Sequence, residues 1–222
     1  MATTKPSLLQ ANKRHTDKRL AQPNCAVLSL AVSNLLVWGR LQLFAQEWKK
    51  IKASSKAMQT IVEGLTLHFT SKELKQKTRR QIRFNSEEEL AITEEVEEMI
   101  NKKAATYTME TDIYQTKAFT QPKTDGGYRL ILNLKPLNNY IETKRFKMES
   151  LKTAIDSLEQ DNWFVKVDIK DAYLHVPVNK SSQRYLCFQW KGQTIQFQAM
   201  PFGLNIAPRV FTKLMKPVLQ HL

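Results

Sequence analysis

Cysteine is scarce in this sequence, which contains only Cys25 and Cys187 among its 222 residues. The two lie far apart, and neither has the closely spaced cysteine or histidine neighbours that hold zinc. The sequence therefore predicts neither a disulfide framework nor a zinc site. We expect an intracellular, reducing environment, and the sequence does not distinguish the nucleus from the cytoplasm.

Long hydrophobic runs are also missing. The most apolar segment, CAVLSLAVSNLLVW from Cys25, is interrupted by Ser29, Ser33 and Asn34. It is shorter than the ~20 residues that a membrane span needs. We therefore expect a buried helix here, and no membrane partner for the protein.

Acidic residues are absent from Ala172 to Leu222. Over the whole chain, 34 Lys and Arg residues against 21 Asp and Glu residues give a formal net charge of +13. Clustered cations gain affinity for phosphate groups because binding releases condensed counterions. Nucleic acid is therefore the first partner that the composition favours, and an anionic membrane surface is the second.

The sequence does contain enough apolar residues for a folded core, at 42% hydrophobic, which suits one or two domains. We expect residues 1–23 to form a basic, disordered tail, residues 24–104 a mainly helical extension, and residues 105–222 a segment of mixed strands and helices. Within the extension, the run SEEEL predicts a helix start, with Ser86 as the N-cap and Glu89 completing a capping box.

Two β-hairpins are predicted after residue 104. The first places TDGG between ETDIYQTKAFTQ and YRLILNL, and the second places Lys191 and Gly192 between RYLCFQW and QTIQFQAM. The runs MESLKTAIDSLEQ and IAPRVFTKLMKPVLQHL have the spacing of amphipathic helices. The fold class is therefore α+β, with mixed or antiparallel strands backed by helices.

A carboxylate follows an apolar run in WFVKVDIKDAYLHVPV. We interpret the run as a buried strand that reaches the surface at Asp168. Buried charge is costly unless it is paired or binds a cation. A strand-end aspartate suits Mg²⁺, which completes its shell with phosphate oxygens and water. The spacing alone also fits a second interpretation, in which Asp168 and Asp171 are ordinary turn or salt-bridge residues.

Three segments carry a family resemblance. VDIKDAYLHVPV resembles the first catalytic motif of reverse transcriptases, QAMPFGLNIAPRVF resembles the template-and-nucleotide motif that follows it, and PKTDGGYRLILNLKPLN resembles the fingers hairpin. The runs FKMESLKTAI and GRLQLFAQEWKKI are most similar to DIRS-type retrotransposons, while gypsy-type elements share MPFGL and APxxF. The resemblance implies the fingers and partial palm of a right-hand polymerase, preceded by a helical amino-terminal extension.

The resemblance also implies roles for particular residues. Asp168 would hold the catalytic metals, two Mg²⁺ ions in the complete enzyme, with the backbone carbonyl of Ile169 assisting. Lys123 and Arg129 would clamp the incoming triphosphate, and Tyr173 would lie under its sugar and exclude a 2′-hydroxyl. The full implied nucleotide-binding set is Lys123, Arg129, Asp171, Ala172, Tyr173, Phe202 and Gly203.

The implied reaction is templated nucleotidyl transfer from deoxynucleoside triphosphates onto a primer on an RNA or DNA template. The family also needs a Tyr-X-Asp-Asp hairpin, which does not occur before Leu222. We therefore expect the remaining polymerase segment to be a partner, and the 222 residues alone to be inactive. Two alternatives stay open: a catalytically dead remnant that binds nucleic acid, and an inert product that binds nothing specifically.

Overall fold

The computed structural model describes residues 37–71, 74, 83–122, 124, 127–148, 150–156, 159 and 167–221. All of them belong to one compact unit, residues 36–222. The predicted basic tail and most of the apolar segment that begins at Cys25 lie outside the described residues, as do Lys123 and residues 161–166. No helix in the described ranges is long and apolar enough to cross a membrane.

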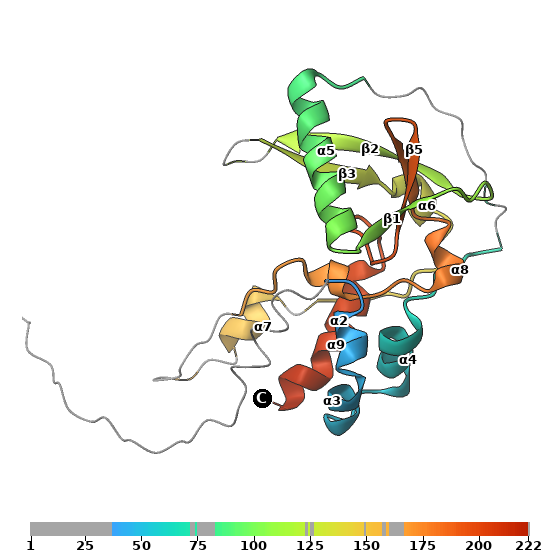
Figure 1. Cartoon of the computed structure of the whole chain (residues 1–222). Helices are drawn as coiled ribbons and strands as arrows, with labels where there is room; N and C mark the ends of the chain where they lie inside the picture. Colours follow the sequence, from blue (N-terminus) through green and yellow to red (C-terminus); the bar gives the residue numbers. More distant parts are fainter. Residues whose placement is uncertain are drawn as a thin grey trace, which may run out of the picture. The chain divides into compact units, whose positions relative to one another are not determined.

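A mixed sheet forms the upper part of the view in Figure 1. Within the described ranges it has five strands in the order β1-β5-β4-β2-β3. Their bounds are β1 Ala105–Thr108, β2 Gln115–Pro122, β3 Tyr128–Asn133, β4 Cys187–Trp190 and β5 Gln193–Phe197. β2 pairs with β3, and β4 with β5, both antiparallel, so both predicted hairpins are confirmed. A short parallel pairing of β2 with β4 joins the two hairpins.

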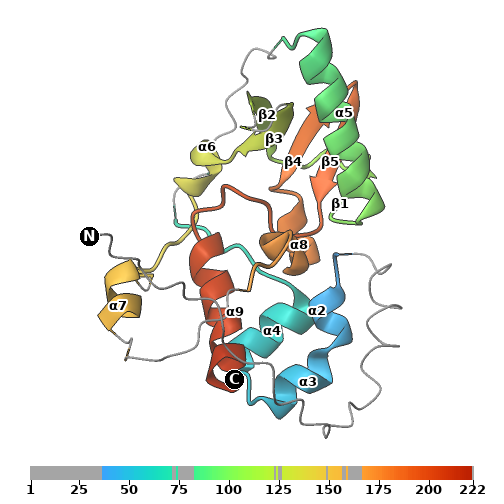
Figure 2. The same ribbon diagram turned by 90° about the vertical axis from the view of Figure 1, so that its left-hand side faces the viewer.

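Short helices connect and cover the strands. Their bounds are α2 Arg40–Leu43, α3 Ala45–Lys50, α4 Ser55–Glu63, α5 Ser86–Asn101, α6 Lys135–Asn138, α7 Leu151–Asp156, α8 Lys180–Gln183 and α9 Ala207–His221, with a 3₁₀ helix η1 at Ala172–His175. α5 lies against β1 and β3 (Figures 1 and 2). It buries Ile92 and Val96 there, as its helical spacing dictates.

The start of α5 corrects one detail of the sequence-based prediction. The N-cap is Asn85, whose side chain accepts a hydrogen bond from the backbone N–H of Glu88, and the Glu88 carboxylate accepts one from the Asn85 N–H. The capping box is therefore real but begins one residue before Ser86. Asparagine and serine both serve as N-caps, so composition alone did not fix the register.

The helices α2, α3 and α4 pack together at the amino-terminal side of the unit and bury Trp48, Ala57 and Ile61. The chain then continues through residues 64–70, which we call the linking segment. Its Leu65 exchanges backbone hydrogen bonds with Pro177 and Asn179, and its His68 and Thr70 pair with Glu142 and Tyr140. The linking segment therefore joins two parts of the chain that lie far apart in sequence.

Gly64 opens the linking segment with a φ of +87° and a ψ of 161°, a combination that is essentially restricted to glycine. A Cβ atom here would lie 2.5 Å from the backbone nitrogen of Asn179. Because the neighbour is backbone, it cannot rotate away. The close approach of these two chain segments therefore requires glycine.

The described residues on both sides of residue 104 share one hydrophobic core. Ile61 and Ile92 come from the amino-terminal side, and Phe188, Ile195 and Met200 from the carboxy-terminal side. The division into a helical extension and a polymerase segment stays a prediction about function. The structure has a single core across it.

The strand expected to reach the surface at Asp168 needs a correction at residues 167 and 168, the part of it that lies within the described residues. Ala172–His175 form the 3₁₀ helix η1, and residues 167–171 have no strand pairing among the described residues. The turn begins at Asp171, whose φ of 55° is left-handed and incompatible with a strand. Extended backbone resumes at Pro177 and Val178, which bridge to Ala199 and Leu65.

Candidate nucleotide and metal site

An aromatic cluster joins the first catalytic motif to the template-and-nucleotide motif. The ring of Tyr173, on η1, lies 4.9 Å from the ring of Phe202 and 5.6 Å from that of Phe211, measured between centroids. Both distances are within the range of favourable aromatic pairs. Phe202 is 55% exposed, whereas Tyr173 and Phe211 are half-buried. Tyr173 is thus supported from α9, and Phe202 extends the apolar surface into solvent.

A second set of contacts ties the loop at residues 202–205 to the end of the first hairpin. The Asn138 side chain, on α6, donates a hydrogen bond of 2.8 Å to the Gly203 carbonyl and accepts one of 3.1 Å from the Asn205 N–H. The Asn205 side chain donates to the Asn138 carbonyl at 3.1 Å. Gly203 itself has a φ of +96°, which disfavours a side chain there.

Asp168 is exposed, and its carboxylate has no ion pair or hydrogen bond among the described residues. Mg²⁺ needs only one or two protein carboxylates when phosphate oxygens and water fill its shell. Asp168 therefore fits one such ligand, and the half-buried Ile169 follows it directly. The described ranges contain no group of three or more His, Cys, Asp and Glu side chains that could hold a metal.

Asp171 is engaged elsewhere. Its carboxylate accepts a 2.8 Å hydrogen bond from the ammonium group of Lys102, at the end of α5, and Lys102 also pairs with Glu98 at 2.6 Å. Burial, the largest single cause, lowers the pKa of Lys102, but the hydrogen bonds and the charge attraction of Asp171 and Glu98 together outweigh it and leave the pKa raised. Lys102 therefore stays charged at neutral pH.

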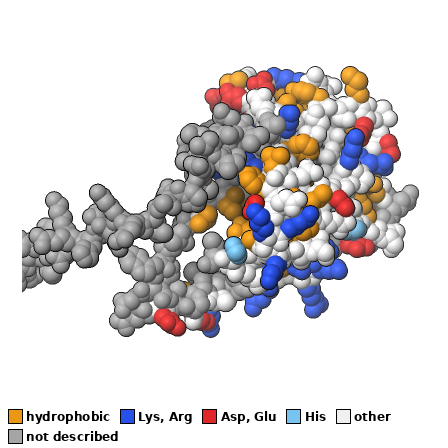
Figure 3. Space-filling model, turned by 60° about the horizontal axis from the view of Figure 1, so that its bottom comes forward, with side chains coloured by type: hydrophobic (Ala, Val, Ile, Leu, Met, Phe, Trp, Pro, Cys, Tyr) orange, Lys and Arg blue, Asp and Glu red, His pale blue; other side chains and the backbone are white. Residues whose placement is uncertain are grey.

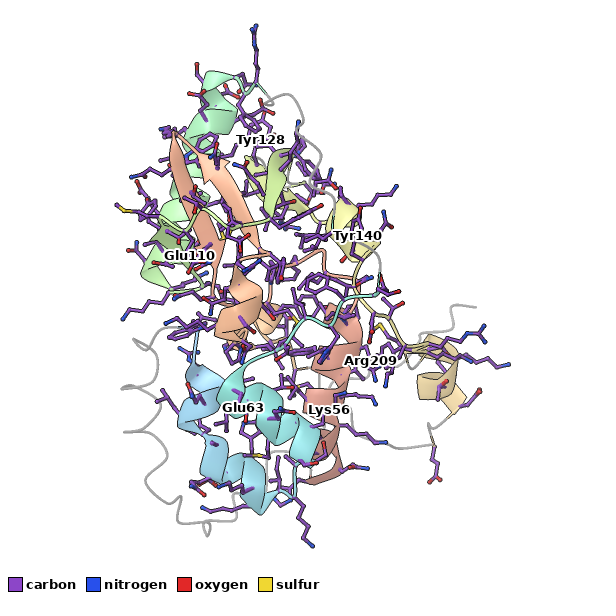
Figure 4. All side chains as sticks on the ribbon, turned by 90° about the vertical axis from the view of Figure 1, so that its right-hand side faces the viewer. Lys56, Glu63, Glu110, Tyr128, Tyr140 and Arg209 are labelled. Atoms are coloured by element: carbon purple, nitrogen blue, oxygen red, sulfur yellow. The ribbon has the colours of Figure 1, made fainter. Side chains whose placement is uncertain are left out.

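The fingers hairpin, β2 and β3, shows fewer contacts with the residues around Asp168 and Tyr173. Arg129 is exposed on β3 opposite Gln121, and among the described residues no hydrogen bond or ion pair joins it to Asp168 or Tyr173. Figure 4 labels Tyr128, the neighbour of Arg129, and Arg209, on the helix that carries Phe211, and they lie well apart in that view. The predicted cationic clamp stays a prediction.

The structure therefore brings together Tyr173, Phe202 and Gly203 from the predicted set. It also adds three residues to which the sequence analysis gave no role in the site: Lys102, and Asn138 and Phe211, which end the fingers-hairpin and template-and-nucleotide runs. Asn138 lies in the fingers-hairpin run, but its contact with Gly203 is 65 positions away, and nothing in the sequence around Lys102 indicates its contact 69 positions away.

Comparison with known proteins shows which protein family and which solved structures the chain is similar to. Residues 121–222 match the family profile described as reverse transcriptase (RNA-dependent DNA polymerase). The prototype foamy virus protease-reverse transcriptase has a similar structure, with a TM-score of 0.59 at 17% identity over 68% of this chain and 20% of that one. The foamy viral enzyme in complex with double-stranded DNA gives a TM-score of 0.61 at 16% identity, over 81% of this chain and 35% of that one. Residues 121–222 are therefore similar in sequence to part of a reverse transcriptase domain, and the fold is that of the foamy viral enzymes.

Two curated relatives in sequence are transposon polyproteins. The Tf2-7 and Tf2-3 transposon polyproteins of Schizosaccharomyces pombe are 28% and 26% identical over 98 residues, which cover 44% of this chain and 7% of each polyprotein. The matched segment thus spans a small part of those relatives, and over this segment the chain is similar to retrotransposon polyproteins. The closer affinity to DIRS-type or gypsy-type elements stays a prediction.

Proposed function

We propose that the chain supplies the fingers and part of the palm of an RNA-directed DNA polymerase of a retroelement. The observation that carries the proposal is the meeting of the three motif segments: Asn138 bonds the end of the fingers hairpin to Gly203 and Asn205, and Phe202 packs on Tyr173. This convergence is what a nucleotide site between fingers and palm requires.

In this proposal each residue has a physical task. The exposed carboxylate of Asp168, with the Ile169 carbonyl, would hold Mg²⁺, and the ion would supply positive charge to compensate the charge that develops in nucleotidyl transfer. Tyr173 offers a ring supported by Phe211 against which a deoxyribose packs, so that a 2′-hydroxyl would clash. Lys123 and Arg129 bind triphosphate oxygens. The chain contributes positioning and charge and no covalent step.

Primer extension tests the proposal. The protein to use is the complete polymerase, meaning this chain together with the remaining polymerase segment. Asp168→Asn should abolish extension with Mg²⁺, because the amide is a poorer ligand and leaves the metal charge uncompensated. Asp156→Asn, at an exposed position of α7, is the matched control and should retain activity. Equal activity of the two variants would refute the assignment of Asp168.

The 222-residue polypeptide by itself should not extend a primer. One carboxylate cannot hold two divalent ions ~3.5–4 Å apart against their mutual repulsion, and Asp171 is committed to Lys102. Extension by this polypeptide that is lost in Asp168→Asn would overturn this part of the proposal.

A second candidate function, nucleic-acid binding without catalysis, is favoured by the net charge of +13 and by the acid-free sequence from Ala172 onward. On the face in Figure 3, several Lys and Arg side chains gather toward the lower edge of the part drawn in colour. Binding of a primed template by the chain alone should weaken by roughly tenfold or more from low to physiological salt. Binding without restored polymerase activity in the complete polymerase would favour this candidate.

A further inference from the structure

Asp171 adopts a backbone conformation that its own turn does not explain. Its φ of 55° and ψ of 33° are left-handed, which non-glycine residues disfavour. Aspartate tolerates this conformation when its side chain bonds to nearby backbone. Here the carboxylate makes no capping bond to η1, and it reaches Lys102, 69 positions earlier in the chain.

Lys102 is well placed to hold this carboxylate still. It ends α5, and its carbonyl accepts a hydrogen bond from the Trp38 N–H. Two residues on, the Ala104 carbonyl accepts hydrogen bonds from the N–H groups of Gln198 and Ala199. The Lys102 and Asp171 side chains are only 21% and 23% exposed. Both partners are thus fixed to ordered backbone and largely shielded from water.

The charge on Asp171 matters because of its neighbours. Ala172 and Tyr173 follow it directly, and in the proposed function they line the nucleotide site. A triphosphate is strongly anionic, so an unpaired carboxylate in this turn would repel it, and the repulsion would be strong in a partly dehydrated site. The ammonium group of Lys102, which Asp171 shares with the more exposed Glu98, compensates part of that charge.

We propose that Lys102 is a positioning residue of the nucleotide site, which holds the turn at residues 168–173 through Asp171 and neutralises its carboxylate so that a triphosphate can approach. The inference rests on the proposed polymerase function and deepens it. It also gives a task to a residue outside the segment that matches the reverse transcriptase profile.

A plain structural ion pair predicts a different outcome from the one proposed. If Lys102 only stabilised the fold, its removal would lower the unfolding temperature and reduce the amount of active enzyme, with an unchanged KM for nucleotide. If Lys102 neutralises Asp171, its removal raises the KM for nucleotide more than it lowers kcat, and removing the carboxylate as well restores the KM.

The test is single-nucleotide incorporation by the complete polymerase on a primed template, with dTTP and Mg²⁺. Lys102→Met should raise the KM for dTTP about tenfold, which corresponds to ~1.4 kcal/mol, with a smaller change in kcat. Lys102→Arg should stay near the unmodified enzyme. The double variant Lys102→Met with Asp171→Asn should recover most of the loss. Lys103→Met, at the exposed neighbouring lysine, is the matched control and should have no effect.

The outcomes separate this inference from the proposed function. Thermal unfolding of each variant of the 222-residue chain corrects for any loss of fold. If the enzyme is active and Asp168-dependent but Lys102→Met leaves KM unchanged, or if the double variant is as impaired as Lys102→Met, the role of Lys102 is refuted alone. If the complete polymerase is inactive, or insensitive to Asp168→Asn, the proposed function fails and this inference fails with it.

Discussion

The described residues before and after residue 104 differ in whether their sequence carries recognisable motifs. The later part carries three motifs that resemble a known family, and residues 121–222 match that family's profile. The earlier part carries no catalytic motif, yet it supplies Trp48, Ile61, Ile92 and Val96 to the same core. Motifs therefore mark residues that face ligands, while the scaffold that fixes them is spread over sequence that looks ordinary.

The linking segment shows how this works at one place. Leu65 pairs with Pro177 and Asn179, which come directly after η1 and Tyr173. The N–H of Leu67 donates a 2.9 Å hydrogen bond to the buried hydroxyl of Ser182. The earlier part of the chain is thus hydrogen-bonded to the end of the first catalytic motif and to the residues that follow it. We expect substitutions in the linking segment to be as harmful to the fold as substitutions inside the motifs.

The largest effect is expected at Gly64. Gly64→Ala should lower the free energy of unfolding by about 3 kcal/mol or more, because the Cβ meets backbone and the dihedral angles are strained. This corresponds to a fall in Tm of roughly 6–12 °C for a chain of this size. Thermal unfolding followed by circular dichroism measures it.

Gly192, in the turn between β4 and β5, provides the matched control for Gly64. Its φ of +75° is also positive, but a Cβ there would meet nothing within 4 Å. Gly192→Ala should therefore cost only the left-handed strain of about 1 kcal/mol. If the two substitutions are equally mild, the linking segment does not pack against residues 178 and 179 as described, and the comparison between the two parts of the chain fails.

A smaller effect is expected inside the motif-bearing part, at Asn138. Asn138→Ala removes the hydrogen bonds to the Gly203 carbonyl and the Asn205 N–H, which should cost about 1–2 kcal/mol. Amide hydrogen exchange at Asn205 should become faster, because its acceptor is lost. Asn139→Ala, at the exposed end of α6, should change neither quantity. Unchanged exchange in Asn138→Ala would show that the loop is held by other contacts.

Much of the later part could be predicted from its sequence. Both hairpins carry turn residues between alternating strands, and these local signals were sufficient. The helix from Ala207 also followed from its spacing. The structure differs before Asp168, where the apolar run was interpreted as a strand but residues 167 and 168 have no strand pairing among the described residues. A single left-handed residue, Asp171, starts a 3₁₀ turn further along, and its carboxylate bonds to a lysine 69 positions away.

In the candidate site, sequence predicted only the residues whose role follows from their side chain and their motif. Tyr173, Phe202 and Gly203 were expected from their motifs, and the structure brings them together. Lys102 was not expected, because a lysine at a helix end is usually a solvated charge that suits the helix dipole. Its second role appears only when the fold places α5 beside the turn of Asp171.

The smallest effect concerns the register of the capping box on α5. Asn85→Ala should cost about 1 kcal/mol, since it removes the acceptor for the Glu88 N–H. Ser86→Ala should be close to neutral, because Ser86 is the first residue inside the helix and alanine is a better helix former. Chemical denaturation of the two variants under identical conditions gives the difference. A larger loss for Ser86→Ala would restore the register that the run SEEEL suggested and would contradict the cap at Asn85. In the present register the Glu88 carboxylate also accepts a 2.6 Å hydrogen bond from the hydroxyl of Thr120 on β2. A cap at Ser86 would be inconsistent with this hydrogen bond, which links α5 to the sheet.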